Sequence, residues 1–526
     1  ISGRFKYWEG SMNSSNPSTV LSAGTIPAEK IRHAPPRASS MLESLRGLGY
    51  STAAALADII DNSISAEATT VDIQFNWKGN SSNIYILDNG SGMSDGELES
   101  ALTLGDKNPL DARSAHDLGR FGMGLKTASF SQCKRLTVAS IKNGLVSCLR
   151  WDLDILTANP DMGWILIEGP AAGSEDLLAK LVSYDQGTIV IWEVLDRIVT
   201  EGFTVDDFLR LMEENVERHL AMVFHRMLEG NHPRLRLNLN GRKIEPWDPF
   251  LSGHPAKPWT SPVQRHRTSC GDIEVQCHVL PHRDRLTDRE FEINGGPAGW
   301  NAQQGFYVYR NQRLLVAGGW LGLGQPRAWN REEPHRMARI RLDIPNTADA
   351  DWKIDVKKSV ARPPVALRSW LTSIATDTRD RARRVFAYRG SPTATTAGAP
   401  IEQAWKVDRT SKGIRYRIDE SHPSIAAVLD AAHANHRDLI LSMLRVIEET
   451  VPVQKIWLDT AEQKETPLIS FASSTDTAVL GVMTTLFKDM LVRKGMTVED
   501  ARARLSCTDP FQNFPHLIAQ LSLPED

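Results

Sequence analysis

Two patterns of apolar and polar residues organise the first part of the chain. Between Ser51 and Ala66, apolar residues recur on one face of a helix, at positions 53, 56, 57, 60 and 64. Residues 71–77 alternate between apolar and polar, as a half-buried strand does, and residues 83–87 form a second short apolar strand. Ser51 can cap the helix, and a turn rich in Gly, Asn and Ser separates the strands. The pattern therefore predicts a helix followed by two strands.

A second domain is predicted further along the chain. The longest helical pattern, over residues 205–228, places six apolar residues near one face: Leu209, Met212, Val216, Leu220, Val223 and Met227. We expect it to lead into a domain that begins with a hairpin at residues 234–244 and ends with a helix near Tyr388. The Asn240-Gly241 pair suits the tight turn of that hairpin, because both residues tolerate positive φ.

The sequence after Tyr388 predicts a linker and a third domain. Residues 391–400 (SPTATTAGAP) have almost nothing to bury, which is typical of a linker. The remainder, to Asp526, has a mostly helical pattern, with apolar residues at positions 425, 428, 429, 439, 441 and 444. We therefore expect an N-terminal arm that starts with a cloning-derived segment, a first domain, a second domain, a linker and a helical C-terminal domain, at residues 1–39, 40–200, 201–388, 389–400 and 401–526.

The composition is that of an ordinary soluble globular protein. The chain has 526 residues, of which 41% are hydrophobic, and a formal net charge of −3. This near-neutral balance argues against a chain held to DNA or to a membrane by bulk charge, so any such contact must come from a local patch. No run approaches the roughly 18 apolar residues that a membrane helix needs. The five cysteines follow no pattern, which favours the reducing cytoplasm as the location.

The first candidate chemistry lies on the helix after Ser51. Asp58 and Asn62 are one helical turn apart and point away from the apolar stripe. A carboxylate in that place can orient and polarise a water molecule, and a carboxamide oxygen can bind Mg²⁺. For this helix alone, a solvated polar face is the alternative interpretation.

The second candidate follows the second strand. Asp88 stands at the strand end and is followed by Gly90, Gly92 and Met93. The carboxylate can accept a hydrogen bond from an exocyclic amine, and the glycines let the backbone approach a flat ring closely. A plain Asp-Asn-Gly turn is the alternative. Residues 94–97 then have the form of a capping box, which predicts the start of a new helix.

The third candidate is a glycine-rich loop that opens into a helix at residues 119–129. Backbone amides at Gly122 and Gly124, at the positive end of a helix dipole, can bind an anion, and Lys126 adds charge. Leu125 separates the last glycine from Lys126, which departs from the Walker pattern, and the third glycine of a dinucleotide fingerprint is missing. These departures exclude the commoner phosphate loops.

Together, the motifs Asp58-x-x-x-Asn62, Asp88-x-Gly90-x-Gly92 and Gly119-x-x-Gly122-x-Gly124 resemble the ATP site of the GHKL superfamily. Its members include gyrase B, the heat-shock chaperones, mismatch-repair MutL, histidine kinases and the MORC proteins. A fourth element, residues 187–192, resembles the Gly-Thr strand that closes the site beside the adenine. The resemblance implies an α+β fold, with a Bergerat-type α/β sandwich ATPase domain followed by an S5-like transducer domain and the helical C-terminal domain.

The resemblance also implies roles for individual residues. Asn62 would bind Mg²⁺, Asp88 would accept from the adenine amine, and Gly92 would face the ring. The residues implied to hold ATP and Mg²⁺ are Asn62, Asp88, Gly90, Gly92, Met93, Gly119, Gly122, Met123, Gly124, Lys126 and Thr188. Residues 104–118 would form a mobile lid, which suits their polar sequence.

The catalytic base departs from the family pattern. The family's ATPases usually have Glu where Asp58 stands, and the shorter side chain predicts that the water is held less well and that hydrolysis is slow. Asp61 is a possible substitute base, although it lies on a different face from Asn62. We favour Asp58.

The second domain resembles a particular branch of the family. Residues 245–250 and 305–315 are similar to the transducer domain of MORC and MutL-type proteins. Residues 352–359 would then supply the lysine that reaches the γ-phosphate: Lys357 or Lys358, and otherwise Lys353. A basic strand end that faces solvent is the alternative.

By resemblance, the function is that of a prokaryotic MORC/MutL-like ATPase. It would hydrolyse ATP to ADP and phosphate and work as an ATP-gated dimeric clamp, with DNA and DNA-processing partners, in defence against foreign DNA. A chaperone-like ATPase that acts on protein clients is the alternative. A basic run, at positions 379, 381, 383, 384 and 389, is a candidate DNA contact, although cations near a helix C-terminus are favourable in any case.

Overall fold

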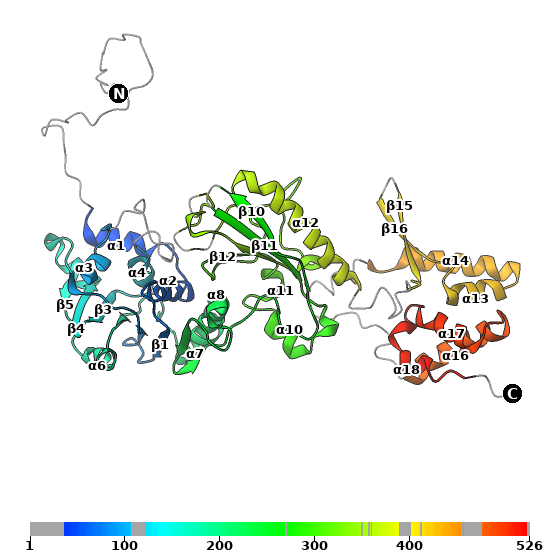
Figure 1. Ribbon diagram of the computed structural model, residues 1–526, viewed down its shortest axis with the longest axis horizontal. Helices are drawn as coiled ribbons and strands as arrows, with labels where there is room; N and C mark the ends of the chain where they lie inside the picture. Colours follow the sequence, from blue (N-terminus) through cyan, green and yellow to red (C-terminus); the bar gives the residue numbers. More distant parts are fainter. Residues whose placement is uncertain are drawn as a thin grey trace, which may run out of the picture.

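The computed structural model describes residues 36–106, 123–268, 271–348, 351–355, 358, 360–388, 401–410, 413–453, 456 and 476–522. Figure 1 shows two neighbouring units, each built from a β-sheet and helices, and a further group of elements toward the C-terminus. The structure is therefore of the α+β class that the sequence predicted.

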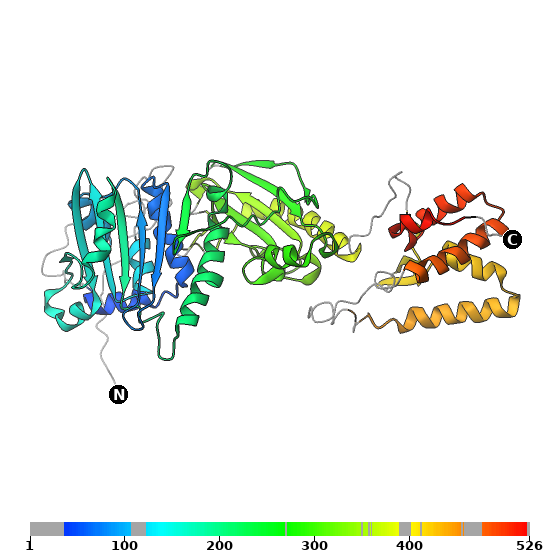
Figure 2. The same ribbon diagram turned by 90° about the horizontal axis from the view of Figure 1, so that it is seen from below.

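The first unit is an eight-stranded sheet, whose strands lie side by side in Figure 2. Their order is β5 (Ile167–Glu168), β4 (Leu145–Asp152), β3 (Arg135–Lys142), β6 (Gly187–Glu193), β2 (Asn83–Asp88), β1 (Thr70–Asn76), β7 (Arg236–Leu239) and β8 (Arg242–Lys243). One large core includes residues of the helices α1 (Ala38–Arg46), α2 (Thr52–Ser65), α3 (Asp95–Leu102), α4 (Gly124–Phe130) and α5 (Leu153–Ala158). A smaller cluster packs α6 (Glu175–Ala179) and the 3-10 turn Leu181–Ser183 against β2, β3 and β6.

The first predicted elements form as the apolar pattern indicates. Ser51 caps α2 by accepting a hydrogen bond from the backbone N–H of Ala54 at 3.2 Å, and the predicted apolar stripe of the helix is buried. Strand β1 alternates between buried and half-buried residues, and β2 is buried throughout. The capping box at Ser94 and Glu97 opens α3. Local patterning therefore predicts these elements correctly.

The predicted hairpin forms but does not open the second domain. Asn240 (φ 46°) and Gly241 (φ 76°) make the turn between β7 and β8, as expected. Strand β7, however, pairs in parallel with β1, and its Leu237 and Leu239 are buried in the core of the first unit. The prediction that this hairpin opens the second domain was therefore wrong, because β7 pairs with the edge of β1 that β2 leaves open.

The long helix predicted at residues 205–228 is interrupted. It consists of α7 (Val205–Arg210), a π-helical stretch (Leu211–Glu217), α8 (Arg218–Val223) and α9 (His225–Leu228). The wider π turn changes the helical spacing, so that Phe208 is buried while the predicted core residue Leu209 is 43% exposed. The other five residues of the predicted face are buried.

The second unit contains a six-stranded sheet covered by the long helix α12 (Val365–Tyr388). The strand order is β10 (Gln264–Thr268), β11 (Gly271–Val279), β14 (Ala338–Asp343), β12 (Gly305–Arg310) and β13 (Arg313–Ala317), with β9 (Trp259–Thr260) paired to β11. Two short helices, α10 (Asp288–Asn294) and α11 (Gly299–Ala302), complete the unit.

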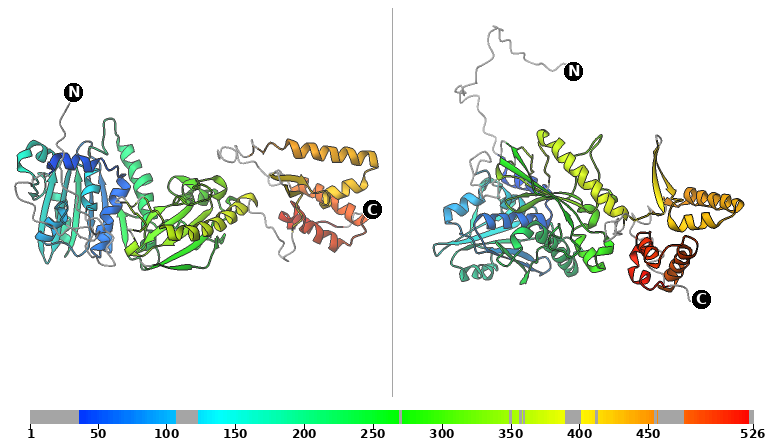
Figure 3. Two further views of the ribbon diagram at one scale, coloured as in Figure 1. Left: turned by 90° about the horizontal axis from the view of Figure 1, so that it is seen from above. Right: turned by 45° about the vertical axis from the view of Figure 1, so that its right-hand side comes forward.

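The C-terminal elements form a mostly helical group that opens with an unpredicted hairpin (Figure 3). They are β15 (Trp405–Thr410), β16 (Gly413–Ile418), α13 (Pro423–Ala431), α14 (Ala434–Thr450), α16 (Asp476–Val492), α17 (Val498–Ser506) and α18 (Pro515–Ile518). Of the expected apolar face, Leu429 is buried, whereas Val428 and Leu439 are exposed. In the described parts of the chain, no helix combines the length and apolar character needed to cross a membrane.

Candidate functional site

Asp88 lies at the end of β2, where its carboxylate is held from two sides. Ser63 Oγ donates to Asp88 Oδ2 at 2.7 Å, and the backbone N–H of Gly90 donates to Oδ1 at 2.9 Å. Thr188 of β6 is the cross-strand partner of Asp88. Burial raises the pKa of the Asp88 carboxyl, although the hydrogen bonds from Ser63 and Gly90 act in the opposite direction. The carboxylate is therefore fixed in position and partly stripped of water.

The glycines around Asp88 permit close packing of the backbone. A Cβ atom on Gly92, whose φ is +66°, would lie 2.0 Å from the carbonyl oxygen of Ile141. A Cβ atom on Gly90 would lie 2.9 Å from the Ala66 carbonyl oxygen, and one on Gly187 would lie 2.2 Å from the Asp88 carbonyl oxygen. In this structure, contacts within the protein are sufficient to require glycine at these three positions.

Replacement of Gly92 by alanine is expected to lower the free energy of unfolding by about 2 kcal/mol or more, because the new Cβ atom collides with backbone in a left-handed conformation. Gly96→Ala is the matched control, since Gly96 lies within α3 and its Cβ would meet no atom within 4 Å. Urea denaturation of both variants measures the difference. Equal stability of Gly92→Ala and the wild type would contradict the packing explanation.

Met93 and Thr188 are joined to this region through Ser140. The backbone N–H of Met93 donates to Ser140 Oγ at 2.8 Å, and Ser140 Oγ lies 2.9 Å from Thr188 Oγ1. The Met93 side chain packs against the core of the first unit. Sequence reasoning missed Ser63 and Ser140, because single serines in a helix and a strand carry no motif. Of the two, Ser63 alone has a sequence signal, because it directly follows the Asp58-x-x-x-Asn62 motif.

Only the last part of the glycine-rich loop lies among the described residues. Gly119, Gly122 and residues 107–118 of the expected lid lie outside them, whereas Met123 precedes α4 and Gly124 is its first residue. A Cβ atom on Gly124 would lie 3.9 Å from Asp58 Oδ2, so the start of α4 faces the predicted base.

Lys126 does not extend into solvent. Its Nζ donates to the backbone carbonyls of Ala101 and Thr103, at 2.9 and 2.8 Å. The side chain is almost fully buried. In this structure the ammonium group therefore binds the C-terminal carbonyls of α3, and a role in holding phosphate stays a prediction.

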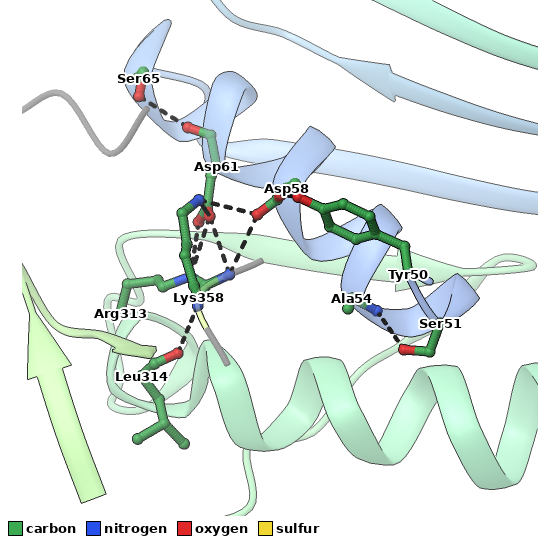
Figure 4. A network of polar contacts seen from close by, with 9 residues as sticks. All are labelled: Tyr50, Ser51, Ala54, Asp58, Asp61, Ser65, Arg313, Leu314 and Lys358. Atoms are coloured by element: carbon green, nitrogen blue, oxygen red, sulfur yellow. Dashed lines mark hydrogen bonds and ion pairs between the residues drawn. The ribbon is translucent and has the colours of Figure 1, made fainter. Parts of the chain in front are cut away.

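Four charged side chains meet between the two units (Figure 4). Lys358 Nζ lies 3.0 Å from Asp58 Oδ1 and 2.5 Å from Asp61 Oδ2. Arg313 Nε lies 3.1 Å from both carboxylate oxygens of Asp61. The side chains of Asp58, Asp61, Arg313 and Lys358 are 4%, 1%, 5% and 9% exposed. Asp58 and Asp61 therefore form part of a buried ion cluster, and the solvated-face interpretation does not apply to either of them.

Tyr50 completes the cluster from the residue before the helix cap. Its hydroxyl donates to Asp58 Oδ2 at 3.0 Å. Burial, together with the nearby Asp58 charge, raises the pKa of Tyr50, so the hydroxyl keeps its proton and remains a donor. Asp58 is thus held by Tyr50 on one oxygen and by Lys358 on the other.

Asp61 is ionised within the cluster. Burial alone would raise the pKa of its carboxyl, but the charges of Arg313 and Lys358 outweigh burial and hold the pKa below its ordinary value. Sequence reasoning missed Arg313 and Tyr50. Arg313 lies within the segment that resembles the transducer, but its spacing from Asp61 along the chain gave no sign of contact.

Asn62 and the three candidate lysines differ in their exposure and contacts. Asn62 is exposed, and among the described residues its side-chain amide has no hydrogen-bond partner. Of the three candidate lysines, Lys358 reaches Asp58, Lys353 is exposed, and Lys357 lies outside the described residues. The structure therefore brings Asp58 and Lys358 together and leaves Asn62, one helical turn from Asp58, exposed.

Comparison with known proteins places the same region in a family. Residues 50–188 match the family described as histidine kinase-, DNA gyrase B-, and HSP90-like ATPase. The ATPase morc-1 of Caenorhabditis elegans is 30% identical over 95 residues, which cover 18% of this chain and 11% of that protein. The matched residues run from Tyr50 to Thr188 and include Asp58, Asn62 and Asp88. Residues 50–188 are therefore similar to the GHKL ATPases, and a stretch of 95 residues is similar to a MORC ATPase.

Proposed function

We propose that the protein binds ATP with Mg²⁺, hydrolyses it slowly to ADP and phosphate, and works as an ATP-gated dimeric clamp. The observation that carries this proposal is the contact of Lys358, from the second unit, with Asp58 in the ATPase domain. Lys358 belongs to the second unit and contacts the predicted base in the first. A change at the nucleotide site can therefore change the relative position of the units.

The described residues fit such a ligand. Ser63 and Gly90 each donate to one carboxylate oxygen of Asp88, and a carboxylate oxygen can accept a further hydrogen bond, as from the adenine amine. The unpartnered Asn62 amide offers an oxygen to Mg²⁺, a metal that prefers oxygen ligands. Mg²⁺ would neutralise charge on the phosphates.

The chemical step follows from the placement of Asp58. The oxygen of a water molecule attacks the γ-phosphorus, the bond from phosphorus to the β–γ bridging oxygen breaks, and Asp58 accepts a proton from the water. When ATP binds, the Lys358 ammonium moves from the carboxylates to the γ-phosphate. Asp58 Oδ1, which Lys358 contacts in this structure, is then free to accept the proton. Asp61 keeps Arg313 as its partner, which favours Asp58 as the base.

Asn62→Ala is expected to weaken Mg²⁺-dependent ATP binding by at least about tenfold, because the metal loses its protein oxygen. Calorimetric titration with a non-hydrolysable ATP analogue, with Mg²⁺ and with EDTA, measures this loss. Asn80→Ala serves as the control, because Asn80 is an exposed asparagine in the turn between β1 and β2. An unchanged Mg²⁺ dependence in Asn62→Ala would refute the assignment.

For the partner we propose DNA, together with proteins that process it, in defence against foreign DNA. The Arg379 guanidinium packs inside the protein. Its Cζ atom lies 4.6 Å from the ring centroid of Trp320 and 4.5 Å from that of Trp329. Arg383 and Arg384 of α12 are exposed, and neither forms an ion pair with a described residue. Arg389 lies outside the described residues. The exposed pair is a local basic patch of the kind that can bind phosphate groups.

Duplex DNA is expected to stimulate ATP turnover at low salt, and the stimulation should fall steeply as salt rises. Arg383→Ala/Arg384→Ala should reduce this stimulation and leave the rate without DNA unchanged. A steady-state ATPase assay over a salt series measures both effects. Stimulation by unfolded protein and not by DNA would favour the chaperone-like alternative.

A further inference from the structure

A cavity of about 630 Å³ lies between the ATPase domain and the second unit. Its walls come from α2, α8, β13 and the loop that follows, Lys358, residues 360–362 and the start of α12. The volume is in the range of sites for small molecules. Asp88, Gly90, Gly92 and Thr188 do not line the cavity, so it is separate from the predicted adenine pocket.

The side chains that line this cavity are strongly cationic. Arg313, Arg331, Lys358, Arg362 and Arg368 line it, and none of the described residues in its wall is acidic. Arg313 and Lys358 are neutralised by Asp58 and Asp61. The other three arginines form no ion pair with any described residue. Three positive charges in the cavity are therefore uncompensated by that part of the protein.

His219, the other polar side chain among the described residues of the wall, does not add to this charge. Burial, with the nearby charge of Arg313, lowers the pKa of His219 to about 4, so the imidazole is neutral at pH 7. The rest of the wall is largely apolar and includes Val223, Leu315 and Val360. The cavity thus combines guanidinium groups, which recognise phosphate well, with apolar surface.

We propose that this interdomain cavity binds a small anion that carries phosphate groups, at a site additional to the nucleotide site. Its size excludes a nucleic-acid duplex from the interior, which favours a small molecule over DNA. Because Lys358 lies in the wall and also contacts Asp58, the occupant is placed to act on the ion cluster. This last consequence rests on the proposed function, whereas binding itself does not.

The test is calorimetric titration of the full chain with inorganic phosphate and with pyrophosphate. One arm contains a saturating non-hydrolysable ATP analogue, with Mg²⁺ in excess of all phosphates, to fill the nucleotide site. The variant is Arg331→Ala/Arg362→Ala, which removes two exposed side chains of the cavity wall. Arg265→Ala/Arg267→Ala removes two exposed arginines from β10 and is the control of equal charge.

Pyrophosphate is expected to bind in both arms, at least tenfold more weakly to the cavity variant and unchanged to the control. Equal binding to the cavity variant and the wild type, or no binding up to millimolar pyrophosphate, would overturn the proposal. Displacement of pyrophosphate by duplex DNA would also overturn it, because the ligand would then be nucleic acid. Thermal melting checks folding, and the single variant Arg362→Gln repeats the test if the double variant unfolds. Failure of the analogue to bind would count against the ATPase alone.

Discussion

Asp58→Asn is expected to bind ATP as tightly as the wild type and to hydrolyse it at least about 100-fold more slowly. The amide has the shape of the carboxylate, and the Tyr50 hydroxyl can still donate to its oxygen. The amide cannot accept a proton from the attacking water at neutral pH. Lys358 retains Asp61 as a partner, so the variant does not leave this ammonium unpaired.

Turnover and binding must be measured separately for this prediction. Single-turnover hydrolysis reports the chemical step, and titration with a non-hydrolysable analogue reports binding. Asp58→Glu is the first control and should retain turnover, because glutamate keeps a carboxylate that can accept the proton. Asp154→Asn, which removes an exposed partner of Lys134, is the second and should change neither quantity. Unchanged hydrolysis in Asp58→Asn would move the role of base to Asp61 or to another group.

Removal of the Tyr50 hydroxyl is expected to have a smaller effect on turnover than Asp58→Asn. This hydroxyl donates to Asp58, so we expect Tyr50 to act through Asp58 as a positioning residue. Its loss should slow turnover less than the loss of Asp58 itself.

The elements that local pattern specifies could be predicted from the sequence. Helix α2, strands β1 and β2 and the capping box at Ser94 depend on residues within a few positions of one another. The motifs at Asp58 and Asp88 were found for the same reason. Both motifs lie within residues 50–188, which match the histidine kinase-, DNA gyrase B-, and HSP90-like ATPase family.

Features that depend on distant parts of the chain could not be predicted in this way. Strand β7 joins β1 across more than 160 residues, and nothing in the local pattern at residues 236–239 indicates which sheet it will enter. Arg313 lies 252 positions from Asp61, and its role appears only when the two units are placed together. The choice among three lysines was open for the same reason: of the two that the structure describes, Lys358 contacts Asp58 and Asp61, whereas Lys353 is exposed.

Asp61→Asn is expected to lower the free energy of unfolding by roughly 3 kcal/mol or more at pH 7, because Arg313 and Lys358 are left with one carboxylate in a buried site. Both cations belong to the second unit, so the loss should also loosen its contact with the ATPase domain. Urea denaturation measures the first effect, and faster amide hydrogen exchange in α2 and β13 measures the second. Asp154→Asn is again the control.

The pH dependence of the wild type should follow from the same carboxylate. Because the folded pKa of Asp61 is below its ordinary value, its contribution to stability is fully present above the unfolded pKa of about 4. The contribution is lost as the pH falls from there through the folded pKa. Asp61→Asn should therefore lose less stability than the wild type below about pH 4.

A double variant separates the cost of an unpaired cation from the value of the ion pair. Asp61→Asn/Arg313→Met removes the carboxylate and the guanidinium together, and Lys358 keeps Asp58 as its partner. Methionine covers much of the same volume without a charge, so the double variant should be more stable than Asp61→Asn alone. If it is less stable by the sum of the two single changes, the cluster does not act as a unit, and the coupling of the two domains through it would have to be abandoned.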